Sequence, residues 1–510
     1  MSKKNHQGKY NKLIKPLLIA AIILVYVFPL IDALIIIFLG RIAFWHDPAR
    51  DFLLALQKPT FIGPPSGIPG IFYGPYWIWV ISVTQIISKD PRVITFIIFT
   101  IPYFTIFPFL LFKFKKILGI TPLILIWTLF VFNYIFDYST QPWNIHLTPL
   151  ILLLIIYRII FSNYIENKKI KYLPVLIDGF LAGILMNFNI AFGTAVVFGI
   201  VLFISYFYLF QAKNRKLLSI VVLYLLFFSG VVLSFLPFLI FEVRHNFSQI
   251  KTIISVITSP SSVVGYKGFG KQMIIEYFLG IANKPFMLPG IFANIPGLFI
   301  FGNIIYLLKK KILNDTEKKL SVLLLFVSIG LLSLYLYSKN PVWNYHFIGL
   351  EIILFMLLAI AVKQFKLLKF VLSGYVVFVI LINIVNFMTF LNIAMSKPYT
   401  ITTLQTKIYI LDLIKKDAKE NYSVFVYDPA IYTYDYDYLS QWYLKKNISK
   451  NREDAQGNVS YLIIPKTSDA VRKDFIDNKT PAEKYTTDKT WNIPEGTQII
   501  KRVKIPQGVF

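Results

Sequence analysis

Apolar runs of roughly 17 to 25 residues recur along this chain, and they constrain its fold more than any other feature. A helix of that length crosses a hydrocarbon layer of ~30 Å and satisfies its backbone polar groups without water. The runs do not alternate polar with apolar residues, as the strands of a membrane barrel do. Because 56% of the residues are also hydrophobic, the sequence predicts a mainly α-helical, multi-pass membrane protein.

Short clusters of lysine and arginine separate the apolar runs and predict the orientation of the chain. Such clusters mark the cytoplasmic side, and they occur at 3–15, 113–116, 166–171, 213–216, 309–319 and 363–369. The chain must cross twice between successive clusters, so we expect the N-terminus inside the cytoplasmic membrane and the C-terminus outside. About 11 spans are predicted, at 13–39, 92–112, 118–137, 146–162, 174–189, 191–211, 217–241, 290–308, 320–337, 346–362 and 370–392.

The apolar segment 74–88 is short for a span, and it would invert every later basic cluster if it crossed. We expect it to be a helix lying in the outer interface, with Trp77 and Trp79 at headgroup depth. If it does cross, residues 174–211 must instead form a single tilted helix.

Two domains are expected. Residues 1–392 form the transmembrane domain, with outer loops at 40–91 and 242–289, and residues 393–510 form a small extracytoplasmic α/β domain. Its strands are predicted at 423–428, 461–466 and 497–505, and an amphipathic helix at 404–419. The stretch YTYDYDYLSQWY, 432–443, fits a sugar-binding surface or the half-buried face of a strand and helix.

Composition excludes several classes of protein. The formal charge of +26 comes from short clusters between apolar runs, which indicates cytoplasmic anchors rather than a nucleic-acid site. There is no cysteine, so disulfides and thiolate metal sites are excluded. The first apolar run is too long for a cleavable signal peptide and lacks a small-residue cleavage site, so we expect it to be retained as a helix.

The heptapeptide WHDPARD, 45–51, places Asp47 and Asp51 four residues apart with Arg50 between them. On a helix both carboxylates share one face. A carboxylate at the edge of an apolar layer becomes more basic, while a nearby guanidinium fixes its geometry, and this combination suits a general base. A helix cap with a surface ion pair explains the same residues.

The long outer loop opens with FEVRHNF, in which Arg244 and His245 offer donors for a phosphate at headgroup depth. Lys267 and Lys271, in GYKGFGK, are expected to supplement them. Snorkelling anchors at a helix end are the alternative for the first pair, and a flexible loop is the alternative for the lysines.

Two outer turns, TQPWNIH and PVWNYH, share a Trp-Asn-x-His pattern. Aromatic rings beside amide and imidazole groups suit a sugar or a lipid headgroup, although tryptophans at this depth are also ordinary anchors. The spacing of the histidines does not by itself make a metal site, and none is predicted. The candidate sugar- or lipid-binding residues of these turns are Trp143, Asn144, Asn344 and His346.

These motifs resemble the GT-C superfamily of membrane glycosyltransferases that use polyprenyl-phosphate-linked sugars, which includes protein O-mannosyltransferases and aminoarabinose transferases. Their first outer loop carries Asp-x-Ala-Arg, read here as Asp47 to Arg50. One bacterial branch adds elements that appear here as DPARD, IGPPSGIPG, FYGPYWIW and FEVRHNF. The likeness covers roughly residues 15–350 in order and spacing.

The resemblance implies an inverting transfer at the outer leaflet, from a polyprenyl-phosphate sugar to a glycan, lipid or protein hydroxyl. It implies that Asp47 is the base and that Arg50 contacts the donor phosphate. No cofactor is expected, and a divalent metal stays open. Relatives usually carry a second acid beside the first, or one before a basic-Pro-Pro element, whereas this chain has Pro48 and Tyr73-Gly74-Pro75. The basic residue of that element is therefore missing here, and Arg244 and His245 are expected to bind the phosphate in its place. Tyr73, which stands at this position, is a further candidate sugar- or lipid-binding residue.

Two other classes are compatible with a polytopic basic chain. A transporter or lipid flippase predicts paired repeats and broken helices with ionisable groups near the bilayer midplane, whereas no repeat is visible and charge within the spans is sparse. An assembly protein whose outer domain binds partners gives no reason for Asp and Arg to gather beside the bilayer.

Overall fold

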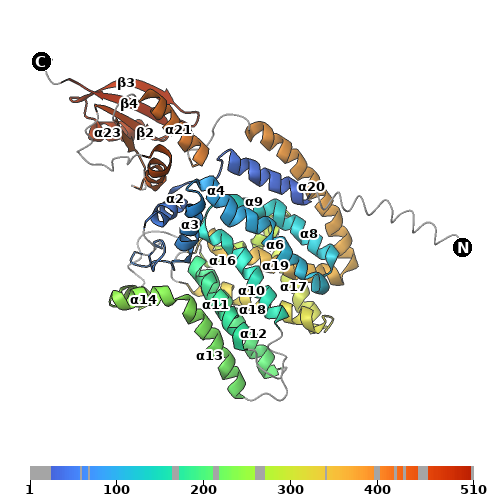
Figure 1. Cartoon of the computed structure of the whole chain (residues 1–510). Coiled ribbons are helices and arrows are strands. Elements are labelled where there is room, and N and C mark those ends of the chain that lie inside the picture. The colour runs from blue at the N-terminus through green and yellow to red at the C-terminus, as the bar shows by residue number, and fades with distance from the viewer. Residues whose placement is uncertain are drawn as a thin grey trace, which may run out of the picture.

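The computed structural model describes residues 25–506, apart from 58–59, 67–68, 163–171, 211–216, 259–269, 339–341, 395–401, 419–421, 429–431 and 446–457. A large helical part carries a small sheet domain at one end (Figure 1). The predicted basic clusters at 3–15, 166–171 and 213–216, the first part of the predicted span 13–39, and Lys267 lie outside the described residues.

Helices occupy the described part of every predicted span. After a first helix, Val25–Phe38, the helical part consists of α2 (His46–Ala55), α3 (Tyr76–Ile87), α4 (Pro91–Thr95), η1 (Phe96–Thr100), α5 (Ile101–Phe104), α6 (Ile106–Lys113), α7 (Lys115–Leu118), α8 (Ile120–Phe130), η2 (Val131–Ile135), α9 (Phe136–Thr140), η3 (Asn144–Leu147), α10 (Thr148–Phe161), α11 (Tyr172–Phe188), α12 (Ile190–Phe210), α13 (Leu217–Ser234), α14 (Leu236–Arg244), α15 (Ser248–Thr258), α16 (Lys271–Gly280), η5 (Ile281–Asn283), η6 (Gly290–Asn294), α17 (Ile295–Lys309), α18 (Asp315–Tyr337), η7 (Asn344–Phe347), α19 (Leu350–Gln364) and α20 (Lys366–Ala394).

Six of the described helices are long and apolar enough to cross a membrane, or up to seven if the bent pair Ile220–Ser234 and Leu236–Arg244 forms one span. The chain is therefore a multi-pass membrane protein, and the exact number of spans stays a prediction. Because α11 ends at Phe188 and α12 begins at Ile190, the described residues of 174–211 form two helices rather than one. Helix α3 has 12 residues, fewer than the ~20 that a span needs.

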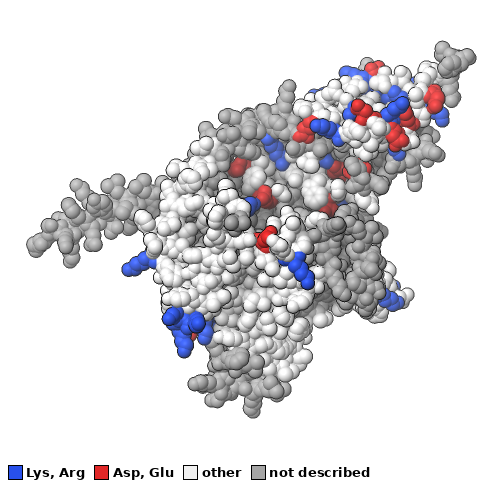
Figure 2. Space-filling model, turned by 180° about the vertical axis from the view of Figure 1, so that it is seen from behind, with Lys and Arg blue, Asp and Glu red and all other residues white. Residues whose placement is uncertain are grey.

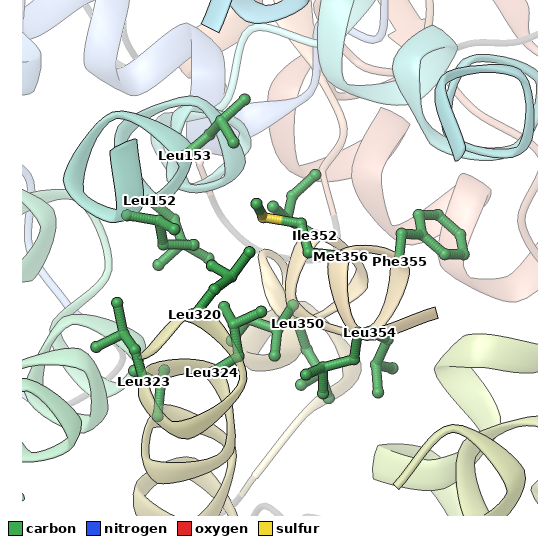
Figure 3. Close-up of a cluster of buried hydrophobic side chains, with 14 of the residues drawn as sticks. Leu152, Leu153, Leu320, Leu323, Leu324, Leu350, Ile352, Leu354, Phe355 and Met356 are labelled. Carbon is green, nitrogen blue, oxygen red and sulfur yellow. The ribbon is translucent and has the colours of Figure 1, made fainter. Parts of the chain in front are cut away.

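Helix α19 lies at the centre of the helical part. All its side chains from Leu350 to Val362 are buried, as expected for a helix that is apolar on every side. Small residues allow close packing elsewhere, since a Cβ on Gly179 of α11 would lie 1.9 Å from the Phe227 carbonyl oxygen of α13. Figure 3 shows the main core where α10, α18 and α19 meet, with Leu152, Leu153, Leu320, Leu324, Ile352 and Met356 among its side chains.

The C-terminal domain contains a four-stranded sheet in the order β1-β2-β4-β3. The predicted strands and helix are confirmed as β1 (Tyr422–Val426), β2 (Val459–Ile464), β4 (Gln498–Lys504) and α21 (Leu404–Asp417). Strand β3 (Tyr485–Asn492) and helix α23 (Asp469–Lys479) were not predicted. β3 is largely exposed and α23 has no buried residue, so neither segment carries the apolar periodicity from which such an element is predicted. The aromatic stretch after residue 431 forms α22 (Tyr434–Leu439) and the π-helical turn η8 (Ser440–Leu444).

The sheet domain packs directly against the first loop. One hydrophobic cluster combines Phe52 of α2 and Trp77 of α3 with Tyr438 of α22 and Ile499 of β4. Charged side chains gather on this domain, whereas the helical part is mostly uncharged on the face shown in Figure 2. The first loop thus lies at the boundary between the apolar helical part and a charged domain.

Candidate active site

Helix α2 arranges Asp47, Arg50 and Asp51 as one ion-pair cluster. The Arg50 Nη1 lies 3.0 Å from Asp47 Oδ1, and its Nη2 lies 2.8 Å from Asp51 Oδ1. The Arg50 Nε also donates to Asp51 Oδ1 at 2.9 Å. The helix is capped by Trp45, which makes no side-chain cap bond, and Asp47 lies in the first turn. Asp47 is therefore not the helix cap, whereas the ion pair expected together with that cap is present; a carboxylate in the first turn also interacts favourably with the helix dipole.

The two carboxylates differ in exposure. The Asp51 side chain is 1% exposed, whereas that of Asp47 is 31% exposed. The second oxygen of Asp51 accepts a hydrogen bond of 2.8 Å from Trp77 Nε1. Burial raises the pKa of Asp51 to about 6, against the opposing effects of Arg50 and Trp77. Asp51 therefore anchors the guanidinium, and Asp47 is the carboxylate that a ligand can reach.

A two-stranded turn in the first loop brings Tyr73 to this cluster. The Gly63 amide donates to the Tyr73 carbonyl at 2.8 Å, and the Tyr73 amide donates to Pro64 at 2.9 Å. Glycine is required at residue 63 because a Cβ there would lie 2.2 Å from the Gly74 carbonyl oxygen. Burial and the phenol of Tyr345 raise the pKa of Tyr73 to about 12, so its hydroxyl stays protonated and is a donor.

The two Trp-Asn-x-His turns form matching 3₁₀ helices, η3 and η7, which lie close together. The ring of Trp143 packs 5.2 Å from Tyr345 and 5.4 Å from Trp45, measured between ring centroids. The phenol of Tyr345 also lies within electrostatic reach of Asp47. The two turns therefore connect helix α2 to the interior of the helical part.

Beside these turns is a cavity of about 1150 Å³. Its size is that of the larger ligand pockets of proteins. Carboxylates, amides and aromatic rings from several helices and turns form its wall. Lys284 adds a cation, with its Nζ 3.3 Å from Asp137 Oδ2 and 4.4 Å from the ring centre of Tyr134. The lining includes Tyr134, Asp137, Tyr138, Gln141, Trp143, His146, Glu276, Tyr277, Lys284, Asn344 and Tyr345.

Three residues that were predicted to bind phosphate, Arg244, His245 and Lys271, make contacts other than those of the ion-pair cluster. Arg244 and His245 are exposed at the end of α14, where Arg244 lies over the Phe61 ring at 5.6 Å and His245 stacks on Phe241. Lys271 is exposed at the start of α16. None of the contacts described for these three residues reaches α2.

Two candidate sugar-binding residues hold the backbone instead. The Asn144 amide is buried and donates to the Phe188 carbonyl at 2.7 Å. The His346 Nδ1 accepts from the Trp343 amide at 3.0 Å. Both bonds shape the 3₁₀ turns that present Trp143 and Tyr345.

Sequence reasoning missed three side chains of this region. Trp77 was assigned to the membrane interface, but it is 1% exposed and bonds to Asp51. Tyr345 stands between the Asn and His of the second Trp-Asn-x-His motif, but nothing in the sequence shows that its ring packs against Trp143. Lys284 lies near the end of the long outer loop, where nothing local distinguishes it from an anchor.

Among the described residues, no three His, Asp or Glu side chains gather closely enough to hold a metal ion. Both carboxylates of α2 are instead engaged by Arg50.

No protein-family model and no curated protein sequence matches the chain. Among solved structures, the chain is similar to the crystal structure of ArnT from Cupriavidus metallidurans bound to undecaprenyl phosphate, at 8% sequence identity and a TM-score of 0.48. The match covers 89% of this chain and 96% of that chain. At this identity and TM-score the likeness transfers neither a family nor an activity to this chain.

Proposed function

We propose that this protein is an inverting membrane glycosyltransferase, which moves a sugar from a polyprenyl-phosphate donor to an acceptor hydroxyl at the outer face of the cytoplasmic membrane. The observation that carries the proposal is the partly exposed carboxylate of Asp47, paired with an Arg50 that the buried Asp51 holds in place, close to a polar and aromatic cavity. A sugar phosphate needs only a base for the acceptor and cationic donors for the departing phosphate.

In the proposed reaction Asp47 takes the proton of the acceptor hydroxyl as its oxygen attacks the anomeric carbon. The bond between that carbon and the phosphate oxygen breaks, and the phosphate leaves with the electron pair. Attack from the side opposite the phosphate inverts the anomeric configuration. A positioned base of this kind is worth ~10² to 10⁴ in rate.

Arg50 is proposed to bind the departing phosphate. Its two bonds to buried Asp51 fix the guanidinium, while its single bond to Asp47 is partly exposed. The Nη1 donor is therefore the one that can exchange Asp47 for a phosphate oxygen, which also frees Asp47 to act as the base. Tyr73 and Lys284 are proposed as further donors to the sugar phosphate.

The test is transfer from a synthetic, radiolabelled undecaprenyl-phosphate hexose by the purified protein in lipid nanodiscs, with a cell-envelope extract as the acceptor. We expect Asp47→Asn to bind undecaprenyl phosphate normally and to lose transfer by at least ~10². Asp469→Asn, at a side chain that is 94% exposed on α23, is the matched control. Equal transfer by wild type and Asp47→Asn would remove Asp47 from the mechanism, and no transfer from glucosyl, mannosyl or N-acetylglucosaminyl donors would reject the activity.

A further inference from the structure

The C-terminal domain is fixed against the back of the helix that carries Asp47. The ring of Tyr438 packs between Phe44 and Phe52, with centroids 5.7 Å from each. Its hydroxyl donates to the Lys89 carbonyl at 2.6 Å. A backbone bridge between Ala43 and Thr403 ties the start of α21 to the same loop. Helix α22 therefore has a defined position relative to α2.

An aromatic pair stands at the start of α22. The rings of Tyr432 and Tyr434 are parallel within 6°, with centroids 5.2 Å apart. Tyr434 is half-buried at the edge of the core shared with α2, and its phenol lies within electrostatic reach of Arg50. Tyr432 is 55% exposed, so much of its ring is open to solvent although it stacks on Tyr434.

Packing explains Tyr434 but not Tyr432, whose exposed ring stacks on the tyrosine that lies within electrostatic reach of Arg50. The acidic residues of the same stretch are not part of this face: Asp435 is buried and paired with Lys407. An aromatic face is electron-rich and apolar, and a pyranose ring presents a face of C–H groups that complements it. The recognition surface is therefore the ring of Tyr432 rather than a carboxylate.

We propose that Tyr432, stacked on Tyr434, binds a sugar ring of a glycan acceptor and delivers its hydroxyl to Asp47. This inference rests on the proposed function and adds the class of the acceptor. The acceptor is favoured over the donor because the hydrocarbon of a polyprenyl donor keeps it in the bilayer, whereas the charged surface of the C-terminal domain favours water. Helix α23 of this domain is charged and has no buried residue, and charged side chains gather on the domain in Figure 2.

The test uses cellotriose, chitotriose and maltotriose as probes in saturation-transfer NMR with the full chain in nanodiscs. We expect at least one trisaccharide to receive saturation at its ring C–H protons. Tyr432→Ala weakens its binding roughly three- to tenfold, the loss of one stacking contact. Tyr432→Phe keeps the ring and keeps the binding. Tyr409→Ala, at a tyrosine of α21 that is 42% exposed, leaves it unchanged.

Three results overturn the inference: no saturation of any trisaccharide by wild type, equal binding by wild type and Tyr432→Ala, or competition between the trisaccharide and undecaprenyl phosphate. Unchanged thermal unfolding of Tyr432→Ala shows that the variant is folded. Normal transfer by Asp47→Asn together with lost sugar binding by Tyr432→Ala would reject catalysis at Asp47 while leaving this sugar-binding surface in place.

Discussion

Replacing Asp51 by Asn tests whether the buried carboxylate anchors Arg50 at a cost in stability. Its pKa is raised from an ordinary 3.8 to about 6 because burial disfavours the charged form. Between these two values the folded chain holds a proton that the unfolded chain has released. Asp51 therefore supports folding fully below about pH 4, and its support is lost as the pH rises through about 6.

The expected size follows from the two pKa values. They differ by about two pH units, and each is worth about 1.36 kcal/mol, so the contribution of Asp51 falls by about 3 kcal/mol between pH 4 and pH 7. Asparagine keeps the shape of the side chain and does not titrate. We therefore expect the stability of Asp51→Asn relative to wild type to increase by about 3 kcal/mol over this range.

The measurement is the free energy of unfolding by SDS titration in mixed micelles, for both proteins at pH 4 and pH 7. Other groups also titrate between these values, and they cancel in the difference between wild type and variant. A difference that does not change with pH would show that Asp51 has an ordinary pKa, and the argument that it is a desolvated anchor would fail. Transfer by Asp51→Asn should also decrease, because Arg50 loses its fixed orientation.

Three further predictions concern the turn, the phosphate donors and metal dependence. Gly63→Ala should lower the free energy of unfolding by ~1–3 kcal/mol, because the added Cβ meets backbone. Gly302→Ala is the control and should not destabilise the protein, because a Cβ there has no atom within 4 Å. Equal thermal unfolding of the two variants would contradict this prediction. Arg50→Lys should lower the rate of transfer by at least ~10². Arg244→Ala should lower it by less than about fivefold, as for a surface contact. A larger loss for Arg244→Ala than for Arg50→Lys in the nanodisc assay would place the phosphate site at α14. Transfer should persist in EDTA, and activity restored by Mg²⁺ would refute a metal-free route.

The fold was largely predictable from local patterns, because each membrane helix carries its own apolar run. Helix α3 and the break at Asn189 also followed from length and charge. The sequence did not predict the shared core, in which Tyr438 of the C-terminal domain packs on Phe52. That contact joins residues far apart in the chain, and no local period encodes it.

The residues of the candidate site were likewise predictable only in part. Asp47, Arg50 and Asp51 were found because their partners lie within one turn of one helix. Tyr73 came from the resemblance alone, and its turn depends on the close approach of Gly63 and Gly74. The partners that complete the site, above all Trp77, Tyr345 and Lys284, come from other elements and are defined only by the packing.

The spacing within residues 47–51 explains why the cluster needs two carboxylates of unequal exposure. An arginine bound only to an exposed aspartate would be free to move, since a surface ion pair is worth ~0–1 kcal/mol. Asp51, adjacent to Arg50 in sequence, turns toward the core and takes two of its donors, while Trp77 occupies the second oxygen. Asp47, three residues before Arg50, faces outward and takes one donor. The bonds to Asp51 thus fix the guanidinium, and the bond to Asp47 is the one that a phosphate can replace. Exchanging the exposures of the two aspartates would therefore remove the base and the phosphate site together.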